Sequence, residues 1–139
     1  METWPYHHLN AQIRRRFDKL LEQVLDELPD KWRDLLEQVP LVVEDRPSRR
    51  VAREMEIEGD EDLCGLYTGI PLTERSVEAS GTMPDQILIF RRGILAEAAN
   101  DAGRISDASL KRQIRITVLH EMGHHFGFEE EALRELGYE

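Results

Sequence analysis

The sequence contains one cysteine and no long apolar run, and each scarcity excludes a class of protein. Cys64 alone cannot form an intramolecular disulfide, so the chain is not a disulfide-stapled secreted scaffold. No segment approaches the ~20 consecutive apolar residues that a membrane span requires. The first residues carry neither the basic start nor the apolar run of a signal peptide. We therefore predict a cytoplasmic protein with no membrane partner.

Positive charge is also scarce. The chain has 18 Lys and Arg against 28 Asp and Glu, which gives a formal net charge of −10. This balance opposes attraction to phosphate backbones, so we expect no nucleic-acid partner. The basic run Arg14, Arg15 and Arg16 lies within a helical pattern, where we expect a solvated face. A length of 139 residues, without a Gly/Ser linker or an internal repeat, predicts a single domain over residues 1–139.

Apolar residues near the start recur at spacings of three and four, which predicts an amphipathic helix over residues 9–28. Its apolar face carries Ile13, Phe17, Leu20, Leu21, Val24, Leu25 and Leu28. Pro29 interrupts this helix, and a helical period continues from Trp32 to Val39 before Pro40.

Strand patterns are shorter. Residues 41–44 and the apolar run 86–90 are predicted strands, whereas residues 63–71 fit either a strand or a loop. The charged stretch 44–62 is predicted to be a surface loop. A helix is expected from about Ile94 to Asn100.

A longer helix is predicted from a cap at Ser106 or Asp107 to about Gly127, followed by a last short helix over residues 129–136. The core-facing residues of the longer helix are expected to be Leu110, Ile114, Thr117, Val118, Leu119 and Met122. Met122, Phe126 and Phe128 are expected to fill core volume.

The long helix ends in the spacing His-Glu-x-x-His, formed by His120, Glu121 and His124. At about 100° per residue, the two histidines lie only ~40° apart around the axis and ~6 Å apart along it. Both imidazoles can therefore reach one metal ion. Glu121 lies ~100° to the side, where its carboxylate can act as a general base toward a water molecule. His125 points away from the ligand face and is expected to pack or to support a ligand.

A catalytic zinc usually has three protein ligands and one open position, so a third ligand is expected after the helix. Gly127 can adopt the left-handed backbone that turns the chain back toward the ion. Glu130 stands ten residues after His120 and is the preferred third ligand, with Glu129 second and Glu131 also chemically suitable. In a random order of this composition, the extended pattern would arise about 3 times in 10,000.

These residues resemble the small bacterial zincin-like metallopeptidases, also called minimal zincins, which have a core like that of the matrix metalloproteases. The similarity extends from the motif, HEMGHHFGFEE, to residues 65–76 and 84–91, and covers roughly residues 41–139. One difference is Glu130, where Asp is common in such proteins. The resemblance implies an α+β fold with a small mixed sheet packed on the active-site helix. It also implies an edge strand that binds extended substrate by strand addition, and residues 87–90 are our candidate.

Taken together, these residues predict a zinc-dependent metallopeptidase that hydrolyses peptide bonds in a peptide or protein substrate. Zn²⁺ is held by His120, His124 and Glu130, and Glu121 is the general base toward the zinc-activated water. Tyr67 and Tyr138 are candidates for stabilising the oxyanion, although tyrosines more often pack. Two alternatives stay open: a non-catalytic zinc-stabilised module that binds peptide or protein, and a metal-independent helical interaction module over residues 13–39.

Overall fold

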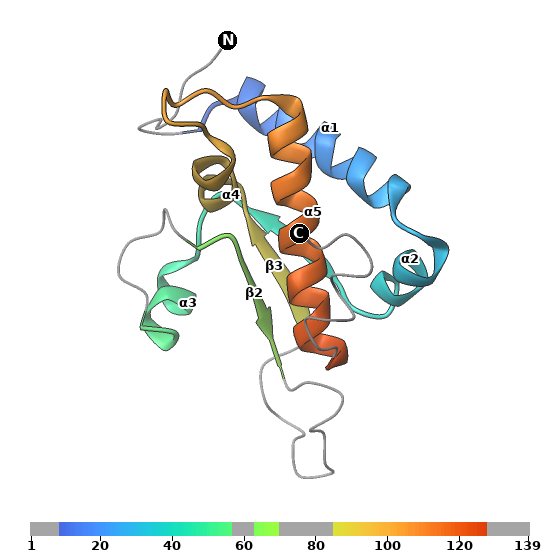
Figure 1. Cartoon of the computed structure of the whole chain (residues 1–139). Helices are drawn as coiled ribbons and strands as arrows, with labels where there is room; N and C mark the ends of the chain where they lie inside the picture. The colour runs from blue at the N-terminus through green and yellow to red at the C-terminus, as the bar shows by residue number, and fades with distance from the viewer. Residues whose placement is uncertain (1–8, 57–62, 70–84, 128–139) are drawn as a thin grey trace, which may run out of the picture.

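The structure is a computed structural model that describes residues 9–56, 63–69 and 85–127 (Figure 1). These residues form a mixed α+β fold, as predicted. The helices are α1 (Ala11–Glu27), α2 (Asp30–Leu36), α3 (Arg49–Glu54), α4 (Arg91–Ala98) and α5 (Asp107–Phe126), and the strands are β1 (Leu41–Glu44), β2 (Gly65–Thr68) and β3 (Gln86–Phe90). The helix predicted over residues 129–136 lies outside the described residues.

The three strands form one mixed sheet in the order β1-β3-β2. β3 pairs in parallel with β1, with Leu41 opposite Ile87, and antiparallel with β2, with Tyr67 opposite Ile87. β3 is therefore the central strand, and our prediction that residues 87–90 form the edge was wrong. A central strand is buried on both faces, which is why residues 87–90 read as a continuous apolar run.

The first two helices follow the sequence pattern closely. The side chain of Asn10 caps α1 by accepting a hydrogen bond from the backbone N–H of Ile13 at 2.8 Å. Phe17 on the apolar face of α1 is fully buried, and Trp32 anchors α2 in the core. Pro29 separates the two helices because its ring disfavours a helical conformation at the preceding residue.

The charged stretch 44–62 is not simply a loop, because it contains α3. Ser48 caps this helix by accepting from the N–H of Val51 at 3.1 Å, and Arg50 pairs with Glu54 one turn later. The helix buries no residue, so it lacks the apolar periodicity that would have revealed it. Residues 57–62 lie outside the described part of the chain.

Helix α4 begins directly after β3, at Arg91 rather than at the predicted Ile94. We had expected Gly93 to precede the helix, but Gly93 lies inside the helix, at a point where the chain near Leu63 leaves no room for a side chain. A Cβ atom at Gly93 would lie 2.0 Å from the backbone oxygen of Leu63. Glycine at this position therefore lets α4 touch the chain just before β2.

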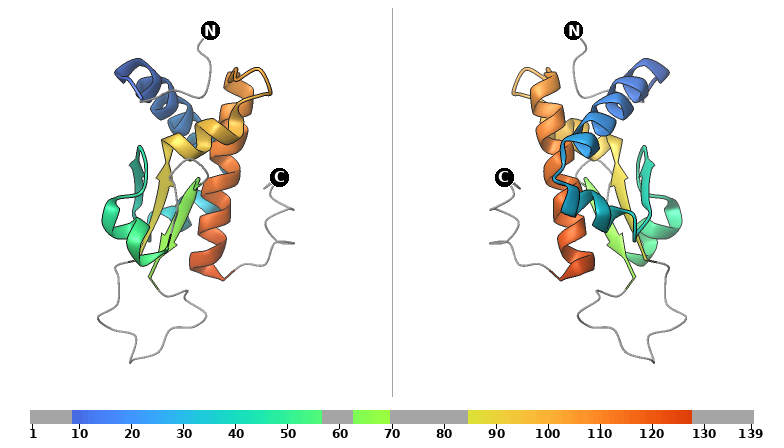
Figure 2. Two further views of the ribbon diagram at one scale, coloured as in Figure 1. Left: turned by 90° about the vertical axis from the view of Figure 1, so that its left-hand side faces the viewer. Right: turned by 90° about the vertical axis from the view of Figure 1, so that its right-hand side faces the viewer.

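Helix α5 is the longest element and positions the motif. Ser106 caps it by accepting from the N–H of Ser109 at 3.0 Å, and Gly127 ends it in the left-handed conformation, with φ of 74°. All six residues predicted to face the core are buried. α5 lies along one face of the sheet, over β2 and β3, while α1 and α4 pack on α5 (Figure 2).

Within the described residues, no helix is long and apolar enough to cross a membrane.

Candidate metal centre

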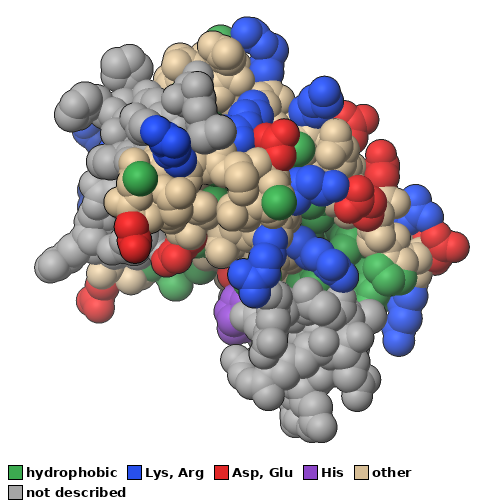
Figure 3. All heavy atoms as spheres, turned by 45° about the horizontal axis from the view of Figure 1, so that its top comes forward, with side chains coloured by type: hydrophobic (Ala, Val, Ile, Leu, Met, Phe, Trp, Pro, Cys, Tyr) green, Lys and Arg blue, Asp and Glu red, His purple; other side chains and the backbone are tan. Residues whose placement is uncertain are grey.

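His120 and His124 lie side by side on the last two turns of α5. Their Nε2 atoms are 3.0 Å apart, and their rings meet edge to face with centroids 4.7 Å apart. Two nitrogen ligands each about 2.0–2.1 Å from a tetrahedral zinc lie about 3.3 Å apart. The observed separation is close to this value. His124 is exposed and His120 is partly exposed, so an ion from solvent can reach the pair. Histidine side chains that reach the surface are purple in Figure 3.

Glu121 points to a different environment from its two neighbours in the motif. Its side chain is buried, with 7 % exposure, and its carboxylate accepts a hydrogen bond from the backbone N–H of Tyr67 on β2. Burial raises the pKa of Glu121 to about 7, and the Tyr67 hydrogen bond opposes this rise. A carboxylate with this pKa can take and return a proton near neutral pH.

The approach of β2 to α5 depends on Gly65. A Cβ atom at Gly65 would lie 2.8 Å from Cγ2 of Thr117 and 3.1 Å from Cγ of Glu121. Thr117 and Glu121 are one turn apart on α5, so the missing side chain of Gly65 leaves room for the helix. The sequence pattern alone did not identify Gly65 as part of the site, because the contact joins two elements far apart in the chain.

Tyr67 contacts two residues of the motif region: its backbone N–H bonds to Glu121, and its ring packs on His125. Its hydroxyl donates to Oδ1 of Asp85 at 3.2 Å, and its ring packs edge to face on the imidazole of His125 at 5.1 Å. His125 is 3 % exposed, so the predicted packed role of this histidine is confirmed. Met122 is fully buried and Phe126 packs against the core, as predicted, while Phe128 lies outside the described residues.

The proposed third ligand lies just beyond the described part of the chain. Gly127 ends α5 with a hydrogen bond from its N–H to the oxygen of Gly123, and its left-handed backbone turns the chain there. Glu130, Glu129 and Glu131 all follow within four residues. In residues 9–56, 63–69 and 85–127, no group of three or more His, Cys, Asp or Glu side chains is placed to hold a metal ion.

The fold and the motif together define the class of protein. A long helix carries His-Glu-x-x-His, and it packs against β2, the antiparallel edge strand of the small mixed sheet that the described residues form, as in zincin-type metallopeptidases. A scan against protein families matches residues 36–138 to the zincin-like metallopeptidases. The chain belongs to this family. A search of curated proteins found no match.

Membership supports a peptidase that acts on peptide or protein substrates and uses a metal cofactor, typically zinc. The residues present fit such an ion: two imidazole nitrogens stand near the separation of zinc ligands, and a buried carboxylate lies beside them.

Proposed function

We propose that this protein hydrolyses peptide bonds with His120, His124 and Glu130 as zinc ligands and Glu121 as the general base. The observation that carries the proposal is the position of Glu121, which is buried and bonded to the Tyr67 amide immediately beside the paired imidazoles. A purely structural metal site does not need a buried base next to its ligands.

Zinc bound at this site would polarise the scissile carbonyl and lower the pKa of a water molecule. The carboxylate of Glu121 takes a proton from the attacking water and delivers it to the leaving amine. The Tyr67 amide holds one carboxylate oxygen in place, which leaves the other oxygen for the water. The surrounding core keeps bulk water from the buried stem of Glu121.

We propose that substrate binds along the outer edge of β2. Hydrogen-bonded positions alternate in an antiparallel pair, and the N–H of Phe90 donates to the oxygen of Cys64 at 2.8 Å. Tyr67 therefore directs its backbone groups away from β3, toward Glu121. The N–H of Tyr67 is bonded to Glu121, so an extended peptide pairs with the other outward groups of this edge, the oxygen of Tyr67 and the backbone of Gly65. Within the described residues no other strand covers this edge.

The substitution Glu121→Gln tests this function because it keeps the size of the side chain and removes its basicity. We expect the variant to fold, to bind zinc and to hydrolyse peptides about 10²- to 10⁴-fold more slowly. The assay is a mixed peptide library analysed by mass spectrometry at near-neutral pH, with a chelated sample as the blank.

Glu97→Gln is the matched control, since Glu97 is an exposed residue of α4 and its change should leave the rate unaltered. Cleavage by Glu121→Gln at the wild-type rate would rule out Glu121 as the base. A wild-type protein that binds one zinc and cleaves nothing would instead be a non-catalytic zinc module.

A further inference from the structure

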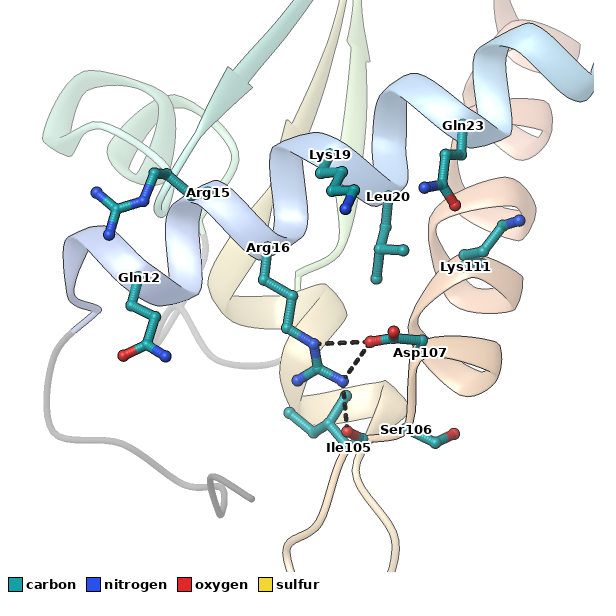
Figure 4. Close-up of a pocket in the computed structure, with 10 residues that line it drawn as sticks. All are labelled: Gln12, Arg15, Arg16, Lys19, Leu20, Gln23, Ile105, Ser106, Asp107 and Lys111. Carbon is teal, nitrogen blue, oxygen red and sulfur yellow. Dashed lines mark hydrogen bonds and ion pairs between the residues drawn. The ribbon is translucent and has the colours of Figure 1, made fainter.

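A second feature of the molecule lies away from the metal centre, between α1 and the first turns of α5. A groove of about 920 Å³ opens there, and its floor includes the buried side chains of Leu20 and Ile105. The side chains that line it are Gln12, Arg15, Arg16, Lys19, Leu20, Gln23, Ile105, Ser106, Asp107 and Lys111 (Figure 4). An apolar floor with a polar rim is the usual form of a peptide-binding groove.

The charge of this groove is opposite to that of the chain. Four of its side chains are cationic and one, Asp107, is anionic, whereas the whole protein has a net charge of −10. Asp18 and Glu22, the acidic residues of α1 nearest in sequence, do not line the groove. Three of the four basic residues of α1, Arg15, Arg16 and Lys19, line the groove, whereas Arg14 pairs with Asp45 outside it.

Two of the four cations are already held in place by ion pairs. Arg16 reaches across to α5, where it binds Oδ1 of Asp107 at 2.7 Å and donates to the oxygen of Ile105 at 2.7 Å (Figure 4). Lys111 binds Glu27 at 2.8 Å. In both pairs the acid is the more exposed partner, with 68 % and 64 % exposure against 31 % and 29 % for the bases. An incoming carboxylate can therefore compete with the acids while the bases stay fixed.

The other two cations have no such partner. Arg15 and Lys19 are exposed, stand one turn apart on α1, and make no ion pair with any described residue. Two unpaired positive charges beside two preorganised ones attract a ligand that carries several negative charges.

The groove is independent of the metal centre. Lys111 and His120 are nine residues apart on α5, which places them about 14 Å apart along the axis and roughly 180° apart around it. A ligand in the groove therefore does not enter the peptidase site.

We propose that this basic groove is a docking site for an acidic peptide segment of a partner protein. Gln12 and Gln23 stand at its two ends, about 16 Å apart along α1, a span that about five extended residues cover. Their amide groups can bond to the backbone of a peptide, and the four cations can bind its carboxylates. The net charge of −10 opposes a nucleic acid, whose charge extends far beyond the groove.

The test measures binding of a fluorescein-labelled hexapeptide of Asp and Glu by fluorescence anisotropy at low salt. We expect the double variant Arg15→Gln/Lys19→Gln to bind this peptide about five- to tenfold more weakly than wild type. The matched control is Arg49→Gln/Arg53→Gln, which removes the same charge from exposed positions of α3. This control and the ligand variant His120→Ala should both bind as wild type does.

Four results would overturn the proposal: no binding of the acidic peptide by wild type, equal weakening by the α1 and α3 variants, loss of binding in His120→Ala, or tighter binding of a labelled single-stranded oligonucleotide. Sedimentation velocity of the same samples tests whether the groove instead binds a second copy of the chain. A wild-type dimer that Arg15→Gln/Lys19→Gln dissociates would assign the groove to a second copy of the chain instead.

Discussion

Glu121 occupies a position where a protein interior normally takes an apolar side chain. A buried carboxylate is costly unless hydrogen bonds compensate for lost water, and the Tyr67 amide supplies one such bond. The helical spacing of the motif predicted that Glu121 lies beside the histidines, because that relation is local to one helix. The amide partner could not be predicted in the same way, since it depends on how β2 meets α5.

The two histidines should each be necessary for metal binding. We expect His120→Ala and His124→Ala to lose stoichiometric zinc, because one imidazole and one carboxylate cannot replace a three-ligand site. The loss of affinity should exceed the roughly 10- to 100-fold that follows removal of a group hydrogen-bonded to a ligand. Elemental analysis of protein purified without a polyhistidine tag measures the ratio. His8→Ala is the control, and full zinc content in either motif variant would disprove the site.

The third zinc ligand is predicted from sequence spacing alone, so its test compares substitutions of Glu130 with those of its two neighbours. Glu130→Ala should weaken zinc binding by about tenfold or more, whereas Glu129→Ala and Glu131→Ala should change it little, because only one carboxylate completes the site. Competition with a chromophoric chelator gives the three affinities under one set of conditions. Equal effects of all three substitutions would show that Glu130 has no special role, and a larger effect of Glu129→Ala would move the ligand there.

At the scale of elements, periodicity predicted α1 well because this helix buries one apolar face along its length. For α5, which buries Glu121 and His125 together with its apolar residues, the cap at Ser106 or Asp107 supplemented periodicity. Periodicity failed for α3, which is held by its Ser48 cap and surface pairs rather than by burial. Periodicity could not predict the order of the strands. The apolar run shows that β3 is buried, but the sequence around a strand does not show which strands lie beside it. The edge beside the metal centre therefore became clear only from the fold.

The contact between β2 and α5 gives a prediction about Gly65. In Gly65→Ala the new methyl group would crowd Thr117 and Glu121, so we expect β2 to shift and the bond between the Tyr67 amide and the Glu121 carboxylate to weaken. We expect kcat to fall about 10- to 100-fold, with zinc content unchanged. The amide proton shift of Tyr67, measured by NMR, should change in parallel and reports the bond whether or not a substrate is known.

A second substitution shows whether Gly65→Ala acts by crowding Thr117 or by disturbing the fold as a whole. Thr117→Ser removes the Cγ2 methyl that lies 2.8 Å from the added Cβ, and it keeps the hydroxyl that donates to the oxygen of Gln113 at 2.8 Å. The double variant Gly65→Ala/Thr117→Ser should recover part of the lost rate. An unaltered Tyr67 shift in Gly65→Ala would show that Gly65 does not position the base.

At the scale of the whole molecule, one acidic residue ties three elements together. Asp45, which follows β1, binds Arg14 of α1 at 2.8 Å and Arg91 of α4 at 3.0 Å, and Arg91 also binds Asp18 of α1 at 2.8 Å. On the predicted solvated face of residues 14–16, Arg14 and Arg16 keep 41 % and 31 % exposure but also bind acids on other parts of the chain. Sequence could not show this, because the partners are 31 and 91 residues away.

This network predicts how stability depends on pH. The Arg14 hydrogen bond, with help from Arg91, holds the pKa of Asp45 below its ordinary value of 3.8. A carboxylate with a lowered pKa in the folded state stabilises the fold above about pH 4, and this contribution disappears as the pH falls below that value. Asp45→Asn should lower the Tm at pH 7 by about 3 °C, and the difference from wild type should shrink toward pH 3.

Thermal unfolding followed by circular dichroism at both pH values measures this difference. Asp101→Asn is the control, since Asp101 is exposed and makes no ion pair with a described residue. A Tm difference between Asp45→Asn and wild type that is as large at pH 3 as at pH 7 would contradict the assigned role of Asp45.

We further propose that residues 1–139 form a single domain. The family match begins at residue 36, yet α1 packs on α5 and buries Phe17 in the same core as Ile114 and Met122. A helix that shares the core of its neighbours contributes to folding with them. The N-terminal helix is therefore part of the peptidase fold in this proposal, and not a separate attachment.

The direct passage from β3 into α4 constrains how the length of this protein can vary. Phe90 ends the strand and Arg91 begins the helix, so no connecting residue can absorb an insertion. One added residue would turn α4 by roughly 100° about its axis and would carry Ile94 and Leu95 out of the core. Insertions and deletions among related sequences should therefore avoid this junction, even where substitutions at Arg91 or Arg92 are accepted.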